Sequence, residues 1–257
     1  MKIAISGKGG VGKTTIAAGL IRYFANKGFE VIAVDADPDL SLGTLLGLPD
    51  NEIEEIKPIV DMRELILEKT GEGAYFTLNP QVDDLLEDFS IPIDDNIKFL
   101  KMGAVKQGGS SCYCRENTVL HALVASLILQ KDQMVLLDMG AGIEHLTRGT
   151  ARGVDVMLIV TEPSRTSIQT AKTVRSLAAE LGIKQIKFIG NKIHETQEED
   201  FLIKHLGREN FLSFLHYQGN VSALSMEPDN SGLNDLAEFV EQLGQRLEKE
   251  VGIQSIE

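Results

Sequence analysis

The sequence predicts an α/β fold, in which a single domain contains an open, mostly parallel β-sheet with helices on both faces. Short runs of apolar, β-branched residues alternate along the chain with longer segments of helical spacing, and this alternation is typical of parallel sheets. The apolar runs lack polar alternation, as expected for strands that are buried on both faces. The 257 residues contain no Ser/Gly-rich linker, so we expect residues 1–257 to form one domain.

The predicted elements begin with a strand, a loop and a helix. Residues 1–6 form the strand, a glycine cluster follows, and residues 15–27 have helical spacing that ends at Gly28. A second buried strand covers residues 30–35. The less regular middle, about residues 49–109, is expected to hold a helix at 62–69 and strands at 75–79 and 97–103. Elsewhere, strands are expected at residues 133–138, 154–160, 186–191 and 211–215, and helices near 118–129, 166–181, 198–205 and 233–251.

The glycine cluster between the first strand and the first helix fits the phosphate-binding pattern G-x-x-x-x-G-K-[ST]. Its glycines let backbone N–H groups close around a phosphate at the helix N-terminus, and its lysine neutralises phosphate charge. Thr14 would ligate Mg²⁺. The predicted ATP-binding residues of this P-loop are Gly7, Lys8, Gly9, Gly10, Val11, Gly12, Lys13, Thr14 and Thr15.

The same glycines also satisfy the dinucleotide pattern G-x-G-x-x-G, and Asp35 lies near the position of a ribose-binding acid in such folds. The Lys-Thr pair after the last glycine favours a nucleoside triphosphate, since a dinucleotide site does not need it. Two later features agree. Asp138 ends an apolar strand and could hold the Mg²⁺ shell, with Gly142 near the γ-phosphate. Asn191 and Lys192 end another strand, where Asn191 could contact adenine or act as a capping residue.

Composition limits the classes of partner. The formal net charge is −13, which disfavours nucleic acid because the chain has no basic surplus to pair with phosphates. No apolar run reaches the roughly 18 residues of a membrane span, and no signal peptide precedes the first strand. We therefore expect a cytoplasmic protein without a membrane or nucleic-acid partner.

Both cysteines of the chain lie together, as Cys112 and Cys114. The start of a helix and the neighbouring Arg115 would favour the thiolate form that binds metal. Two thiolates cannot complete a four-sulfur site, whereas a two-fold dimer with this loop at its axis supplies four. From the C-x-C pattern alone, a buried structural pair and a redox pair remain open.

Lys8, at the second position of the P-loop, gives the chain a resemblance to the deviant Walker A ATPases, which include MinD, ParA, the arsenite-pump ATPase and the nitrogenase iron protein. The resemblance implies a MinD-like P-loop fold and slow hydrolysis of ATP to ADP in a homodimer. Lys8 would reach the partner's phosphates, Asp37 in the first switch would orient the attacking water, and Asp138 would begin the second switch. The implied catalytic residues are Lys8, Lys13, Asp37 and Asp138.

The segments 108–117 and 139–149 are similar to those of CooC-type ATPases, which assist nickel insertion into carbon monoxide dehydrogenase. That resemblance covers most of the chain. It implies that Cys112 and Cys114 bind Ni²⁺ or Zn²⁺ at the dimer interface, with ATP controlling dimerisation and metal release. The client would be carbon monoxide dehydrogenase or the related acetyl-CoA synthase.

Two other members of the class provide alternatives. An electron-transfer ATPase like the nitrogenase iron protein carries an iron–sulfur cluster on two well-separated cysteines, whereas Cys112 and Cys114 are nearly adjacent. A positioning ATPase of the MinD type ends in a basic amphipathic helix, whereas residues 233–251 are rich in Asp and Glu and would be repelled by anionic lipid.

Overall fold

The structure, a computed structural model, describes residues 1–37, 39–71, 77–78, 80–82, 84–103, 114–127, 132–141, 154–217 and 236–252. Their strands are β1 (Lys2–Gly7), β2 (Glu30–Ala36), β3 (Ile91–Asp94), β4 (Ile97–Lys101), β5 (Gln133–Met139), β6 (Val156–Thr161), β7 (Gln185–Ile193) and β8 (Phe211–His216). They form an eight-stranded sheet in the order β3-β4-β2-β5-β1-β6-β7-β8. All neighbours are parallel except β3 and β4, which are antiparallel. The prediction of an open, mostly parallel sheet is confirmed.

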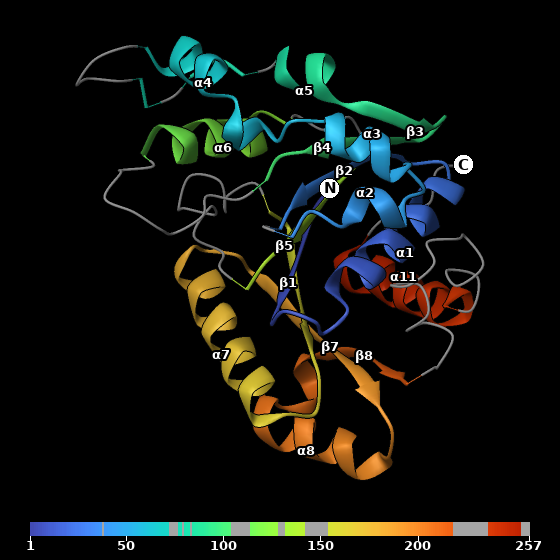
Figure 1. The fold of residues 1–257 in the computed structure, drawn as a ribbon. Coiled ribbons are helices and arrows are strands. Elements are labelled where there is room, and N and C mark those ends of the chain that lie inside the picture. The colour runs from blue at the N-terminus through green and yellow to red at the C-terminus, as the bar shows by residue number, and fades with distance from the viewer. Residues whose placement is uncertain are drawn as a thin grey trace.

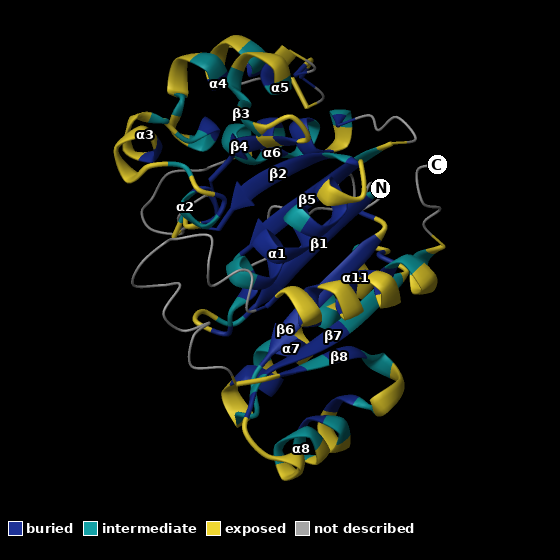
Figure 2. Cartoon of the chain, turned by 90° about the vertical axis from the view of Figure 1, so that its right-hand side faces the viewer, coloured by how far each residue is buried: buried dark blue, intermediate teal, exposed yellow. Residues whose placement is uncertain are grey.

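Helices cover both faces of this sheet (Figures 1 and 2). α1, α2 and α11 lie on one face, whereas α6 and α7 lie on the other, and α8 packs against α7 and β7. In the described part of the chain, no helix is long and apolar enough to cross a membrane. The helices are α1 (Lys13–Asn26), α2 (Leu42–Leu45), α3 (Asp50–Glu55), α4 (Arg63–Thr70), α5 (Asp84–Phe89), α6 (Cys114–Ser126), α7 (Arg165–Glu180), α8 (Thr196–Leu206) and α11 (Ala237–Val251), with short 3-10 helices η1 (Ile59–Asp61) and η3 (Arg208–Asn210).

The central strands are buried on both faces because successive side chains point to opposite sides of the sheet. In β1, Ile3 and Ile5 join the hydrophobic cluster under α1 and α11, whereas Ala4 joins the cluster under α6 and α7. β2 and β5 alternate between the same two clusters. This two-sided burial explains the continuous apolar runs of the sequence, and it leaves the strand ends as the place for polar side chains.

Two glycines allow α1 and α11 to approach closely. A Cβ on Gly244 would lie 2.3 Å from the Tyr23 ring, and one on Gly19 would lie 2.6 Å from Val240. The Tyr23 hydroxyl donates a hydrogen bond to Glu248 across the same contact, at 3.0 Å. The closing helix is therefore packed against the helix that begins at the P-loop.

The structure differs from the sequence-based expectation mainly between residues 42 and 109. The helix expected at 62–69 and the strand at 97–103 are present as α4 and β4, but α2, α3, α5 and β3 were not predicted. The strand expected at 75–79 falls largely outside the described residues, and Thr77 and Leu78 are not in a strand. α1 and α6 begin earlier than expected, at Lys13 and Cys114.

Candidate functional site

The P-loop connects β1 to α1 in a turn that only glycine can make at two positions. Gly7 has φ 151° and a Cβ there would lie 2.3 Å from the Val160 carbonyl oxygen. Gly12 has φ 92°, and its Cβ would lie 2.4 Å from Asn191 Nδ2. Gly12 also stands at the N-cap of α1 and no side chain caps it. The first backbone N–H groups of α1 are thus left to bind an anion such as a phosphate.

Lys13, the first residue of α1, forms a buried ion pair with Asp37 beyond the end of β2. Lys13 Nζ lies 3.3 Å from Asp37 Oδ2, and the two side chains are 7% and 9% exposed. The other oxygen of Asp37 accepts a hydrogen bond from the Asp39 N–H at 3.1 Å. The structure therefore brings two of the predicted catalytic residues together and places the Asp37 carboxylate at the P-loop lysine.

Asp138 lies beside this pair, on β5. It is fully buried, and neither of its carboxylate oxygens has a hydrogen-bond partner of standard geometry. Burial raises the pKa of Asp138 to about 6, although the nearby Thr14 hydroxyl and the Lys13 charge act to lower it. A buried carboxylate without partners is costly. Two free oxygens near Thr14 are the donors that Mg²⁺ prefers, so these residues fit an ATP-bound magnesium ion.

Asp35 is the residue that would bind a ribose if the glycine pattern marked a dinucleotide site. It pairs in register with Asp138 across β2 and β5, and it is buried. Its carboxylate accepts hydrogen bonds from the N–H groups of Leu42 at 3.0 Å and Asp37 at 3.3 Å. Burial and the neighbouring Asp138 charge raise the pKa of Asp35 to about 7. Asp35 therefore holds the chain around Asp37 in place, since each of its carboxylate oxygens accepts a hydrogen bond from a backbone N–H.

Two hydroxyl contacts connect the P-loop strand and helix to neighbouring segments. Ser41 Oγ lies 3.5 Å from Thr14 Oγ1, the predicted magnesium ligand. Ser6 Oγ donates to the carbonyl oxygen of Gly140, just beyond β5, at 2.7 Å. The segments that follow β2 and β5 are therefore both in contact with β1 and α1.

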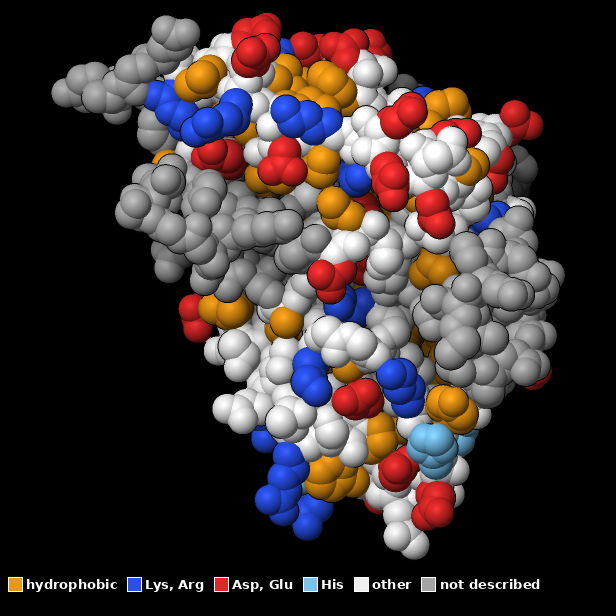
Figure 3. Space-filling model, in the orientation of Figure 1, with side chains coloured by type: hydrophobic (Ala, Val, Ile, Leu, Met, Phe, Trp, Pro, Cys, Tyr) orange, Lys and Arg blue, Asp and Glu red, His pale blue; other side chains and the backbone are white. Residues whose placement is uncertain are grey.

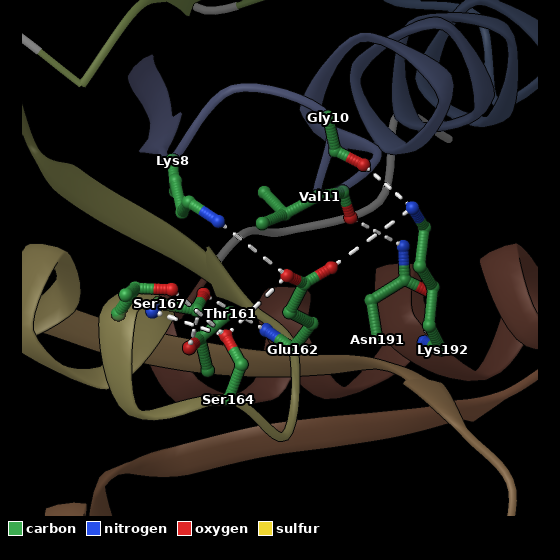
Figure 4. Close-up of polar contacts among 10 residues, drawn as sticks. Lys8, Gly10, Val11, Thr161, Glu162, Ser164, Ser167, Asn191 and Lys192 are labelled. Atoms are coloured by element: carbon green, nitrogen blue, oxygen red, sulfur yellow. Dashed lines mark hydrogen bonds and ion pairs between the residues drawn. The ribbon is translucent and has the colours of Figure 1, made fainter.

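Asn191 and Lys192, at the carboxyl end of β7, also contact the P-loop (Figure 4). Asn191 Nδ2 donates to the Val11 carbonyl at 2.7 Å, while its Oδ1 accepts from the Lys192 N–H at 2.8 Å. Lys192 Nζ donates to the Gly10 carbonyl at 2.6 Å. The amide of Asn191 thus supports the loop, and its contact with adenine stays a prediction.

Lys8 points toward a residue that sequence reasoning missed. Its Nζ lies 3.8 Å from Glu162 Oε1, and Lys192 Nζ lies 4.0 Å from Glu162 Oε2 (Figure 4). Glu162 directly follows β6, the neighbour of β1. The signal in the sequence is an acidic residue at the end of a buried parallel strand, the same signal that identified Asp138.

The cysteine segment is described only in part. Cys114 is the first residue of α6 and is exposed, and its sulfur is disulfide-bonded. Cys112 and Gly142 lie outside the described residues. Arg115 does not stand free beside the sulfur, since its guanidinium donates to Thr70 Oγ1 and the Gly71 carbonyl. Among the described residues, no group of three His, Cys, Asp or Glu side chains is placed to hold a metal ion.

Comparison with known sequences gives the family. The model of the CobQ/CobB/MinD/ParA nucleotide binding domain matches residues 2–231. The carbon monoxide dehydrogenase accessory protein CooC of Rhodospirillum rubrum is 39% identical over 91% of this chain and 89% of its own length. An uncharacterised ATP-binding protein of Methanocaldococcus jannaschii is 44% identical over 86% of this chain and 87% of its own.

Solved structures agree on the fold. The cell division protein MinD of Aquifex aeolicus covers 100% of this chain and 98% of its own, with a TM-score of 0.66 and 20% identity. A plasmid partition protein of Borrelia burgdorferi bound to AMPPNP covers 97% of this chain and 99% of its own, with a TM-score of 0.69 and 16% identity. At such identity the likeness concerns the fold. Together with the sequence matches, it places the chain in the CobQ/CobB/MinD/ParA nucleotide-binding family, as an ATPase of the CooC type.

Proposed function

We propose that this chain is an ATP-hydrolysing maturation factor that acts as a homodimer and assists the insertion of nickel into carbon monoxide dehydrogenase. The observation that carries the proposal is the 39% identity to the accessory protein CooC along nearly the whole of both chains. The two cysteines of the chain, spaced as C-x-C, supply the metal-binding chemistry such a role needs. The related acetyl-CoA synthase is a second possible client of the same chemistry.

The P-loop site would bind ATP with Mg²⁺. Lys13 would neutralise phosphate charge, and Thr14 and Asp138 would hold the metal, directly or through water. Mg²⁺ supplies charge neutralisation at the phosphates when it is bound. Lys13 would turn from Asp37 toward the phosphates, because their larger negative charge attracts its ammonium more strongly than one carboxylate does. The released Asp37 carboxylate would then be close enough to the phosphates to orient water.

Nickel or zinc would be the cargo, held by Cys112 and Cys114 in their reduced form. Two thiolates per chain leave a four-sulfur site half complete, so the proposal requires a second subunit. Lys8 of each subunit would reach the nucleotide of the other, and ATP binding would thereby control the spacing of the four sulfurs. A tenfold change in metal affinity between states needs about 1.4 kcal/mol.

We place this activity in the cytoplasm, without nucleic acid or membrane as a partner. The net charge of −13 supports this assignment. On the face of the molecule shown in Figure 3, acidic and basic side chains are interspersed rather than gathered by sign. Such a surface offers a weak electrostatic footprint for a phosphate backbone.

Metal analysis of the reduced protein with and without ATP tests the proposal. We expect about one Ni²⁺ or Zn²⁺ per two chains, and loss of that metal when Cys112 and Cys114 are both replaced by Ser. ATP binding should survive the double replacement, which serves as the internal control for folding. Visible absorbance and a reducible signal after anaerobic purification would favour an iron–sulfur ATPase. Stimulation by DNA or lipid, with indifference to the serine variant, would favour a positioning ATPase.

A further inference from the structure

Glu162 lies between two lysines at the mouth of the P-loop. One carboxylate oxygen faces Lys8 at 3.8 Å, and the other faces Lys192 at 4.0 Å (Figure 4). The side chains of Lys8 and Lys192 are 41% and 44% exposed, whereas that of Glu162 is 24% exposed. Glu162 is thus the more buried partner of both ion pairs.

The start of α7 fixes the position of Glu162. Its backbone N–H donates to Ser167 Oγ at 3.1 Å, and Ser164 Oγ donates to its Oε1 at 3.4 Å. Ser167 is itself held by a hydroxyl contact with Thr161 at 3.0 Å, and its N–H donates to the N-cap Ser164. A partly buried network of hydroxyl groups therefore sets where the carboxylate of Glu162 stands relative to the P-loop.

Lys192 is anchored on the opposite side. Its backbone has φ 58°, a left-handed conformation that is uncommon for a residue with a side chain. Its ammonium donates to the Gly10 carbonyl, so it is held by the loop as well as by Glu162. The ammonium of Lys8 forms an ion pair with Glu162, whereas that of Lys192 has the hydrogen bond to Gly10 in addition, so Lys8 is the more easily withdrawn of the two lysines.

We propose that Glu162 is a positioning residue that keeps Lys8 on its own subunit until ATP closes the dimer. The inference rests on the proposed function, in which Lys8 reaches the nucleotide of the partner. In this scheme the Lys8 ammonium leaves Glu162 in order to contact phosphates across the interface, so closure breaks this ion pair. Glu162 thereby favours the open state and sets how much ATP-dependent contact is needed to form the dimer.

The expected effect is moderate because the pair is partly exposed. A symmetric dimer breaks two such pairs, one in each subunit. From the range for exposed ion pairs, Glu162→Gln should tighten the ATP-dependent dimer by about tenfold, or about 1.4 kcal/mol. ADP binding to the monomer should change less than about twofold, because Lys8 does not contact the nucleotide of its own subunit in this scheme.

Sedimentation of the full chain with ATP and Mg²⁺ measures the dimer dissociation constant. The variants are Glu162→Gln, Glu162→Asp as the charge-conserving form, and Glu180→Gln at the far end of α7 as the matched control. We expect tighter dimerisation for Glu162→Gln alone. The difference from the parent should shrink as salt rises from about 0.05 M to 0.5 M, since screening weakens exposed ion pairs. A merely structural role for Glu162 would not produce this salt dependence.

A second measurement needs no dimer. Acylation of lysines in the nucleotide-free protein, read by mass spectrometry, should label Lys8 faster in Glu162→Gln, with Lys98 as the reference because it pairs with Glu30. Unchanged labelling of Lys8 would overturn the inference. If the parent dimerises with ATP and Glu162→Gln has the same dimer dissociation constant, the inference is overturned as well. A parent that forms no ATP-dependent dimer would instead overturn the proposed function, and the release of Lys8 with it.

Discussion

Replacing Asp138 by Asn should stabilise the nucleotide-free protein while impairing its use of magnesium. Asp138 is fully buried, and the cost of burying its charge outweighs what the nearby Thr14 hydroxyl and Lys13 charge recover, so its ionised form is poorly compensated. Asn has nearly the same shape and carries no charge, and its amide oxygen can still accept a hydrogen bond from the Thr14 hydroxyl. The expected gain is therefore the cost of the buried charge.

The pKa gives the size and the pH window of this effect. Burial raises the pKa of Asp138 from 3.8 to about 6. Because the folded chain holds this proton more tightly than the unfolded chain, the stability is fully present below about pH 4 and lost as pH rises through about 6. Two pKa units correspond to at most about 3 kcal/mol in the free energy of unfolding above pH 6. Loss of the Asp138 charge should also lower the pKa of Asp35, which that charge raises.

Urea unfolding at pH 6, 7 and 8, without nucleotide or Mg²⁺, measures the difference. Asp138→Asn should need more urea than the parent at each pH, and Asp132→Asn, an exposed replacement before the same strand, should not. Adding ATP and Mg²⁺ should stabilise the parent more than Asp138→Asn, since ligand binding adds to stability according to affinity. Equal unfolding midpoints for the parent and Asp138→Asn across this range would refute the account of Asp138.

Three further substitutions test other parts of the structure. Asp37→Asn should bind ATP at least as tightly as the parent, because the carboxylate no longer competes for Lys13. It should hydrolyse ATP at least about 10²-fold more slowly. An ATPase rate equal to that of the parent would exclude Asp37 as the water-orienting group. Lys13→Ala should abolish ATP binding in calorimetry, and retained micromolar affinity would contradict the P-loop assignment. Gly244→Ala should lower the free energy of unfolding by about 1–3 kcal/mol through its clash with Tyr23, whereas Gln245→Ala on the exposed side of α11 should leave it unchanged.

The strands were predictable because strands that are buried on both faces have continuous runs of apolar residues in the sequence. β1, β2, β5, β6 and β7 all lie within two residues of their predicted starts. The region between β2 and α6 offers weaker signals. Its helices α2, α3 and α5 have four to six residues each, too few for helical periodicity to be recognised. β3 is a four-residue edge strand that contains Pro92, a residue that argues against a strand in a central position.

Some site residues could be predicted from one short segment of sequence, whereas others depend on which strands are neighbours in the sheet. The P-loop residues follow from spacing along one segment, and the structure places Lys13 and Asp37 in contact as an ion pair. Glu162 and Asp35 were not assigned these roles, because their roles depend on which strands are neighbours. More than half of the chain lies between β1 and β6, yet β6 lies directly beside β1 in the sheet. That order of strands cannot be read from any local pattern.

The charges of the nucleotide-free site satisfy one another only in part, and this explains how ATP could act on segments far apart in the sequence. Lys13 is occupied by Asp37, which lies beyond the end of β2, and Lys8 is occupied by Glu162. Asp138 is buried, and only the nearby Thr14 hydroxyl and Lys13 charge act to offset the cost of ionising its carboxylate. In the proposed function, phosphates bound by Lys13 would release Asp37, and a metal ion bound by Asp138 would offset the charge of that buried carboxylate. Binding of ATP and Mg²⁺ would therefore replace contacts within the protein by contacts with the ligand at the ends of both β2 and β5. The segments that follow these two strands would then respond to the same binding event.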